Sequence, residues 1–168
     1  MMWSLLSRTL LRARALYWQL VYRGYRARYA IDPAFRFNGA GVQLYGEGSI
    51  DLGPNSYVGE FCSLQAAHSQ AIQIGRGCSI SHNVRIYTTS AVPDSDFRLA
   101  APRTISGAVS IGDGAWIGAN VYIGPGISIG ANSVVGANSV VTCSIPESEI
   151  WGGVPARLIR RKRPHHDE

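Results

Sequence analysis

The sequence predicts an all-β protein, a parallel β-solenoid, preceded by a helical segment. From residue 111 to residue 146 an aliphatic residue returns every six positions, and glycine follows it in five of the six units. The fourth position of each unit is glycine, asparagine or serine. The units read IGDGAW, IGANVY, IGPGIS, IGANSV, VGANSV and VTCSIP. A period of six is that of short strands separated by corners, and such units bury their apolar sides only by stacking.

Residues 1–30 contain no such unit and are expected to form one or two amphipathic helices. They carry six arginines and no acidic residue. The apolar residues at helical spacing are Trp3, Leu6, Leu10, Tyr17, Val21 and Tyr25. The longest uncharged run, Ala15–Tyr22, is too short to span a bilayer. Two interpretations stay open: peripheral contact with a membrane surface, or packing on the solenoid.

Residues 31–156 are expected to form the solenoid body. Val42 and Leu44 alternate and predict a first, irregular coil, and regular units begin at Leu52. Four residues are inserted beside His68, which is expected to be a solvated corner histidine. Residues 87–108 contain two prolines and do not follow the period, so they are expected to form a loop extruded from the stack.

Residues 157–168 are expected to form a basic helix and tail. Gly152 and Gly153 suit a chain reversal after the last coil. The segment Ala156–Lys162 then predicts a short helix, which Pro164 ends.

Composition narrows the function classes. Residues 31–156 hold five basic and nine acidic residues, so a mildly acidic body lies between two basic ends. No aromatic residues interleave with basic ones on this body, which disfavours nucleic-acid binding, and no phosphate-binding glycine motif is present. Cys62 and Cys78 occupy the small fifth position of their units, while Cys143 falls outside it. The odd cysteine count argues against a disulfide frame and favours the cytoplasm.

The repeats resemble the hexapeptide-repeat acyltransferases, and AWIGANVYIGPGISIG and WGGVPARLIRRK resemble the maltose, galactoside and serine acetyltransferases. The resemblance covers residues 50–162. It implies a left-handed parallel β-helix with three units to a coil. It also implies an acetyl-CoA-dependent enzyme that needs no metal and forms a homotrimer, with a sugar or glycan hydroxyl as acceptor. Polysaccharide biosynthesis is the setting that such an acceptor suggests.

The catalytic histidine of that family is missing at its usual place. Maltose- and galactoside-type enzymes carry it after an IYTATH-like run, and here the run is IYTTSA, with Ala91 at the matching position. The stretch CSISHNVRI resembles the SVDHDCVI-like coil of sialic-acid and bacillosamine pathway acetyltransferases, which makes His82 the expected general base. An imidazole can take the proton of a hydroxyl as it attacks a thioester. A corner at Asn83 is expected to turn His82 outward.

The same resemblance assigns the remaining sites. Ala119 and Ala137 would offer backbone groups to the pantetheine arm, Trp116 and Thr142 would line its groove, and Arg157 and Arg160 would meet the coenzyme A phosphates. In relatives the extruded loop reaches a neighbouring subunit and walls the acceptor pocket. The expected substrate contacts in this loop are Asp94, Asp96 and Phe97.

Other functions stay open beside O-acetylation. N-acetylation of an amino sugar would use the same fold, and a non-catalytic or membrane-associated scaffold would explain the missing histidine at Ala91. A zinc-dependent carbonic anhydrase needs three imidazoles, and His68, His82, His165 and His166 give no trio at coil spacing. The expected location is the cytoplasm, at the inner face of the membrane if residues 1–30 bind lipid.

Overall fold

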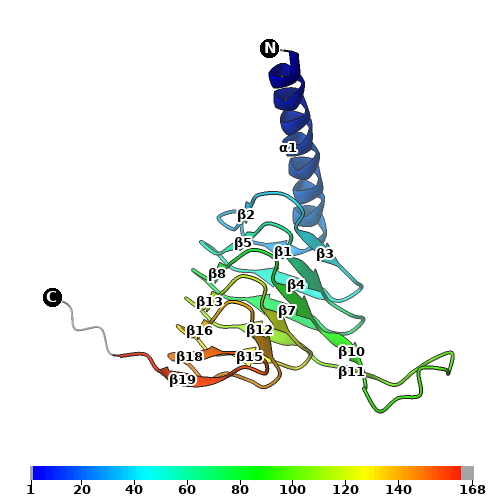
Figure 1. Ribbon diagram of the computed structural model, residues 1–168, viewed down its shortest axis with the longest axis vertical. Coiled ribbons are helices and arrows are strands. Elements are labelled where there is room, and N and C mark those ends of the chain that lie inside the picture. Colours follow the sequence, from blue (N-terminus) through cyan, green and yellow to red (C-terminus); the bar gives the residue numbers. More distant parts are fainter. Residues whose placement is uncertain (1, 164–168) are drawn as a thin grey trace.

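The computed structural model describes residues 2–163, with the side chains of residues 6–163, and shows a three-sided parallel β-helix of five coils (Figure 1). One long helix, α1 (Met2–Arg28), stands at one end of the solenoid, and an antiparallel strand pair closes the other. The predicted β-solenoid is confirmed.

Three parallel sheets form the sides of the solenoid, and each coil gives one strand to each sheet. Sheet A contains β1 (Ala30–Ile31), β4 (Ser49–Leu52), β7 (Ala71–Ile74), β12 (Val109–Ile111) and β15 (Ser128–Ile129). Sheet B contains β2 (Arg36–Asn38), β5 (Tyr57–Gly59), β8 (Ser79–Ile80), β13 (Trp116–Ile117), β16 (Val134–Val135), β18 (Glu149–Gly152) and β19 (Arg157–Arg161). Sheet C contains β3 (Gln43–Tyr45), β6 (Ser63–Gln65), β9 (Arg85–Tyr87), β14 (Tyr122–Ile123) and β17 (Val140–Val141). The predicted first coil is therefore β1, β2 and β3.

The aliphatic first position of each unit forms the core. In sheet A, Leu52, Ile74, Ile111 and Ile129 are in register and are each at most 2% exposed. The same inward columns run through sheets B and C. Each buried aliphatic side chain contributes about 1.5–3 kcal/mol, so the repeated position accounts for both the stacking and the stability of the coils.

The corners follow the fourth position of the units. Asparagine adopts a left-handed backbone at several of them, with φ between 56° and 59° at Asn83, Asn120, Asn132 and Asn138. Asparagine tolerates this region better than most residues with a side chain. These asparagines therefore favour the turns that lead from one sheet to the next.

Helix α1 is a single helix whose C-terminal half caps the first coil. Tyr22 and Tyr29 are buried, and the Tyr22 ring stacks on Phe37 at 4.3 Å between centroids. The Tyr22 hydroxyl donates to Gly39 O at 2.8 Å and accepts from Val42 N at 3.3 Å. Solenoids need such caps because the terminal coil would otherwise expose its apolar interior. The packing interpretation thus holds for this half of α1.

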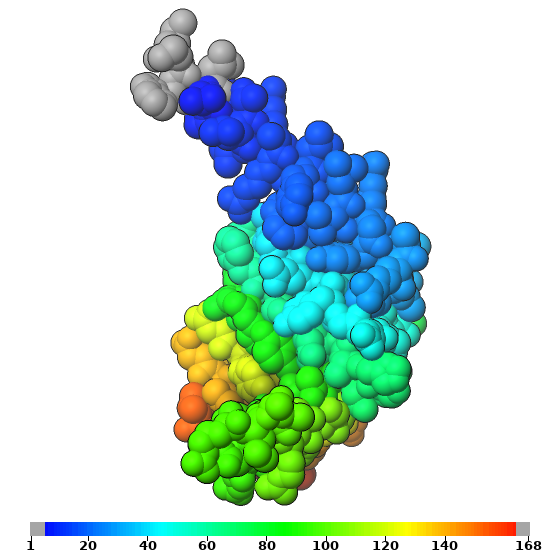
Figure 2. Space-filling model, turned by 90° about the vertical axis from the view of Figure 1, so that its right-hand side faces the viewer, coloured from blue at the N-terminus to red at the C-terminus, as the bar shows by residue number. Residues whose placement is uncertain are grey.

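The N-terminal half of α1 extends past the solenoid (Figures 1 and 2). Leu6, Leu10 and Tyr17 of the predicted apolar face are exposed there, whereas Val21 and Tyr25 pack against the first coil. The Trp3 side chain lies outside the described part of the structure. No helix in the described chain has the length and apolar character needed to cross a membrane.

Residues 87–108 leave the stack as predicted, although Tyr87 still belongs to β9. The segment forms an antiparallel hairpin of β10 (Thr89–Ala91) and β11 (Thr104–Ser106) that projects from the solenoid (Figure 1). Its root is fixed by the buried Thr88, whose Oγ1 accepts from Ala67 N at 2.7 Å.

The predicted C-terminal helix over Ala156–Lys162 is wrong. Residues 153–156 reverse the chain as expected, but the next segment is β19, which pairs antiparallel with β18. The last coil leaves one edge of sheet B with unpaired backbone groups, and β19 satisfies them. Residues 164–168 lie outside the description.

Candidate functional site

The candidate site is a column of residues at the corner between sheets B and C, one from each coil. Backbone hydrogen bonds fix their order along the solenoid axis: Asn83 N donates to Glu60 O at 2.8 Å, Asn120 N to His82 O at 3.0 Å, and Asn138 N to Ala119 O at 2.8 Å. The corner column is therefore Glu60, His82, Ala119 and Ala137, with successive coils about 4.8 Å apart.

His82 is exposed, as the predicted corner requires, and Asn83 has φ 57°. The His82 Nδ1 accepts a hydrogen bond from Glu60 N at 3.1 Å. Because Nδ1 is the acceptor, the proton of the neutral ring lies on Nε2, which is then a donor. A base role for Nε2 requires its proton to move to Nδ1, and the ring must then turn because Nδ1–H cannot accept from Glu60 N.

Gly59 lets His82 come this close. A Cβ at Gly59 would lie 2.9 Å from His82 N and 3.0 Å from His82 Nδ1. The first separation is shorter than real Cβ contacts and the second is unusually tight, so an alanine here would displace the His82 backbone or its ring.

Asparagine side chains bind the coils together beside the column. Asn83 Nδ2 donates to Asn120 Oδ1 at 2.8 Å, and Asn120 Nδ2 donates to Asn138 Oδ1 at 2.9 Å. The ladder holds the three corners in register, which fixes His82 relative to Ala119 and Ala137. Sequence reasoning treated these asparagines only as corner formers; their recurrence at the same position of successive units was the signal for a ladder.

Ala119 and Ala137 present backbone N–H groups that enter none of the hydrogen bonds found in the described chain. Trp116 lies on β13 in the same coil as Ala119, with its side chain 53% exposed on the outer face of sheet B. Its register neighbours there are Ser79 and Val134. The structure thus places an exposed indole and two available donors near the column.

Two arginines lie near the far end of the column. Gly136 N donates to Trp151 O at 2.8 Å, which places β18 one coil beyond Ala137. Arg157 pairs with Gly152 and Arg160 with Ile150 across β18 and β19, and both arginine side chains are exposed. In the described chain neither has a carboxylate partner, since their guanidinium groups donate to main-chain carbonyls.

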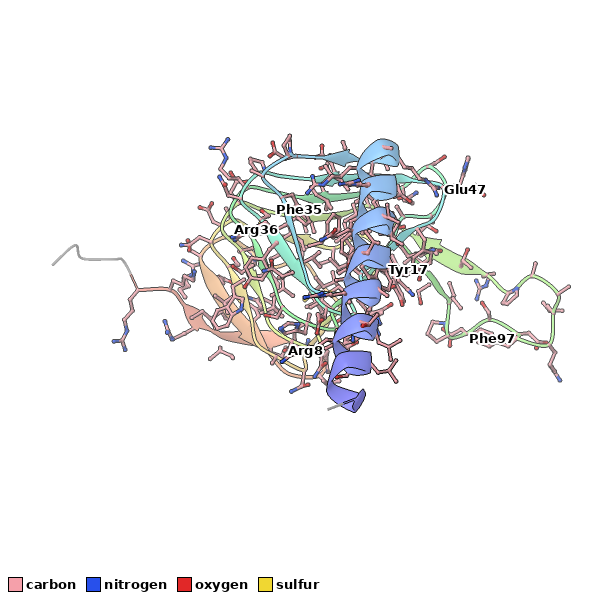
Figure 3. All side chains as sticks on the ribbon, turned by 90° about the horizontal axis from the view of Figure 1, so that it is seen from above. Arg8, Tyr17, Phe35, Arg36, Glu47 and Phe97 are labelled. Carbon is pink, nitrogen blue, oxygen red and sulfur yellow. The ribbon has the colours of Figure 1, made fainter. Side chains whose placement is uncertain are left out.

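The structure does not bring the other predicted residues to the column within one chain. Thr142 is exposed at the next corner, where sheet C turns to sheet A. Asp94, Asp96 and Phe97 are exposed at the tip of the hairpin, and Phe97 lies far out from the solenoid in Figure 3. Hydrogen bonds from Arg98 lower the pKa of Asp96.

Buried cysteines do not supply a nucleophile. Burial raises the pKa of the Cys62 thiol to about 11. The Cys62 Sγ donates to Ser81 O at 3.0 Å and accepts from Val84 N at 3.3 Å, so it serves packing, as predicted. Burial likewise raises the pKa of Cys78.

A shallow cavity of about 810 Å³ lies elsewhere, over sheet A. Its lining includes Asp51, Gln73, Ser110 and Ser128, and none of the column residues. Within residues 2–163 no three His, Cys, Asp or Glu side chains are grouped so that they could hold a metal; His165 and His166 are outside this range.

Comparison with known proteins identifies the family. The bacterial transferase hexapeptide family (six repeats) matches residues 108–143. A hexapeptide-repeat containing acetyltransferase from Vibrio cholerae is 30% identical, with a TM-score of 0.68 over 85% of this chain and 80% of that one. A maltose O-acetyltransferase from Clostridium difficile is 31% identical, with a TM-score of 0.61 over 78% of this chain and 72% of that one.

A galactoside acetyltransferase in complex with coenzyme A is 32% identical, with a TM-score of 0.61 over 77% of this chain and 66% of that one. No curated protein sequence gives a significant match. The predicted resemblance is confirmed by the identity and coverage of the Vibrio cholerae structure. The chain belongs to the hexapeptide-repeat acetyltransferases.

Proposed function

We propose that this protein transfers the acetyl group of acetyl-CoA to a hydroxyl of a sugar or glycan. The observation that carries the proposal is the axial order of the site: the His82 imidazole, then the N–H groups of Ala119 and Ala137, then the guanidinium groups of Arg157 and Arg160. Acetyl-CoA has the same order of groups, with a thioester at one end, a pantetheine arm and phosphates at the other.

The corner column suits an extended arm that lies along the solenoid axis. The Ala119 and Ala137 N–H groups, one coil apart, can donate to successive amide oxygens of the arm, and Trp116 offers an apolar wall beside them. Arg157 and Arg160 can bind phosphate oxygens by charge-assisted hydrogen bonds. Similarity to a structure of the Vibrio cholerae acetyltransferase complexed with acetyl coenzyme A supports this choice of donor.

The reaction is a direct transfer. The acceptor oxygen forms a bond to the thioester carbonyl carbon while His82 takes the hydroxyl proton. A tetrahedral oxyanion forms on the former carbonyl oxygen of the thioester. The carbon–sulfur bond then breaks, and the proton on His82 passes to the departing thiolate, which leaves as the coenzyme A thiol.

Base action by Nε2 of His82 needs the other tautomer, with the proton on Nδ1, together with a ring turn. Turning the imidazole by 180° gives up the hydrogen bond from Glu60 N, which costs about 1 kcal/mol. General-base catalysis contributes about 10²–10⁴ in rate, or roughly 2.7–5.5 kcal/mol at 1.36 kcal/mol per factor of ten. The gain exceeds the cost, so the ring turn does not prevent this role.

A homotrimer would complete the site. The corner column lies between sheets B and C, whereas the hairpin that bears Asp94, Asp96 and Phe97 leaves the solenoid at a different corner, between β9 of sheet C and β12 of sheet A. Side-by-side packing of copies would allow the hairpin of one copy to cover the corner column of the next. The pocket for the acceptor would then form between copies.

The test is consumption of acetyl-CoA in the presence of a panel of sugars, amino sugars and glycans. Thiol release that depends on a hydroxyl acceptor supports the proposal, and mass spectrometry of the product shows whether the acetyl group is on oxygen or nitrogen. N-acetylation alone would redirect the proposal to an amino sugar. A trimer that binds no coenzyme A and consumes no thioester with any acceptor would favour a non-catalytic scaffold.

A further inference from the structure

Helix α1 carries an apolar face that the solenoid does not cover. Five residues on the outer side of the helix form the outer stripe: Leu6, Leu10, Leu16, Tyr17 and Leu20, which are 48–62% exposed. Spacings of three, four and seven residues place them within one arc of the helix. The outer stripe runs from Leu6 to Leu20, about four helical turns, and α1 extends beyond the first coil in this part (Figure 1).

The outer stripe is not needed for the fold of the helix cap. The solenoid is contacted by a different arc of α1, whose residues are Trp18, Val21, Tyr22 and Tyr25. Seen from above, α1 lies in front of the coils, so the side opposite this arc faces away from the body (Figure 3). A large apolar surface that packing does not require marks a binding surface.

The arginines of α1 form two groups, those that contact the solenoid and those that are exposed to solvent. Arg14 pairs with Glu60 at 3.6 Å, and Arg26 and Arg28 donate to backbone carbonyls of the solenoid. Arg8, Arg12 and Arg23 are exposed along one flank of the outer stripe and have no carboxylate partner in the described structure. In Figure 3, Arg8 and Tyr17 are on opposite sides of the helix.

We propose that the outer stripe docks on an anionic lipid surface, with α1 lying in the plane of the membrane. The apolar arc would enter the boundary between headgroups and acyl chains, and the arginine flank would meet lipid phosphates. A lipid surface fits better than a second copy of α1, because the helix contains no acidic residue. Two such helices packed together would bring their arginines close without a carboxylate to neutralise them.

Docking in this way leaves the corner column accessible. Helix α1 caps the first coil, whereas His82 belongs to the third coil and Arg157 to the strand pair at the opposite end. The body would therefore extend from the lipid surface with its candidate site open to the solvent. Binding to lipid is measured without turnover, so its outcome is independent of the proposed acetyl transfer.

The first experiment is sedimentation of the full chain with vesicles of phosphatidylcholine alone or with 30 mol% phosphatidylglycerol. The full chain is expected to sediment with the anionic vesicles and to be released by high salt. Leu10→Gln with Leu20→Gln is expected to weaken binding about tenfold or more, since glutamine keeps helix propensity but removes apolar surface. The matched control is Leu99→Gln with Ile105→Gln, two exposed apolar residues of the hairpin, which is expected to bind like the wild type.

The second experiment tests the arginine flank. Arg8→Gln with Arg12→Gln is expected to weaken binding to anionic vesicles roughly 30-fold, from about 1 kcal/mol per arginine near the surface. Arg76→Gln with Arg103→Gln removes the same charge from exposed arginines of the body and hairpin and is expected to change binding little. Circular dichroism of each variant shows whether α1 remains helical.

Several results would overturn the proposal. Wild-type protein that stays in solution with anionic vesicles would do so, as would a leucine variant that sediments like the wild type. A leucine variant that keeps vesicle binding but changes the mass measured by light scattering would assign the outer stripe to contact between copies.

Discussion

Replacing His82 by alanine should reduce turnover strongly and stability little. Loss of a general base costs about 10²–10⁴ in kcat, which corresponds to roughly 2.7–5.5 kcal/mol of transition-state stabilisation. The side chain is exposed and makes one hydrogen bond, from Glu60 N at 3.1 Å. Removing that bond costs about 1 kcal/mol, so Tm should fall by only about 2–4 °C.

His82→Gln separates proton transfer from hydrogen-bond donation. A glutamine amide can place a donor near the position of Nε2, but it cannot take a proton. If His82 is the base, the glutamine and alanine variants lose similar amounts of activity. The assay is the initial rate of thiol release at saturating acetyl-CoA with an accepted sugar.

His68→Ala is the matched control. His68 is also an exposed corner histidine, with its Nδ1 3.3 Å from Glu47 Oε2, but it lies at a different corner. Its removal should leave turnover unchanged. Near-wild-type turnover of His82→Ala would refute the base assignment, and near-wild-type turnover of His82→Gln alone would make His82 a hydrogen-bond donor to the oxyanion.

Four further predictions concern the support of the site and the fold. Gly59→Ala should lower kcat about tenfold or more, because its Cβ would lie 3.0 Å from His82 Nδ1. Gly24→Ala is the control and should not change kcat, since no atom lies within 4 Å of its added Cβ. Equal kinetics of the two variants would contradict this prediction. Arg157→Ala with Arg160→Ala should raise the KM for acetyl-CoA at least tenfold with little change in kcat, since charge-assisted hydrogen bonds contribute about 1.5–3 kcal/mol. An unchanged KM would show that these two residues do not bind the phosphates. Tyr22→Phe should lower the free energy of unfolding by about 1–3 kcal/mol, because the buried N–H of Val42 loses its acceptor and the carbonyl of Gly39 loses its donor. Thermal unfolding with Tyr17→Phe as the exposed control measures the difference. A thiol reagent at pH 8 should modify Cys143 rapidly and leave Cys62 and Cys78 intact, because burial raises the pKa of both thiols; rapid labelling of all three would show that the coils open.

The sequence predicted the structure best at positions where a single local property, such as burial of an aliphatic side chain, decides the residue type. The aliphatic first position predicts the core because its side chain points inward in every unit, and Ile74, Ile111 and Ile129 are all buried there. The order of His82, Ala119 and Ala137 could also be predicted, since unit spacing gives coil spacing. Thr142 was grouped with them by resemblance, but it lies one corner away because sheet C separates them.

The predictions that were wrong, or that the sequence left open, concern features that depend on tertiary contacts. The segment after Gly153 contains good helix formers such as Leu158 and Arg160, yet the open edge of β18 makes it a strand. The tautomer of His82 is set by the N–H of Glu60 in the preceding coil, which no local pattern reveals. The apolar face of α1 was visible as a periodicity, but only the structure divides it into a packed arc and an exposed stripe.

The most direct test is a crystal structure of the full chain with coenzyme A. The coenzyme is expected to lie along the corner column, with its sulfur within about 4 Å of the His82 ring, which is near van der Waals contact. Its pantetheine amides should accept from the N–H groups of Ala119 and Ala137, and its phosphates should meet Arg157 and Arg160. Coenzyme A bound over sheet A at Ser110 and Ser128, or bound along the column with its phosphates at His82, would contradict the proposed site.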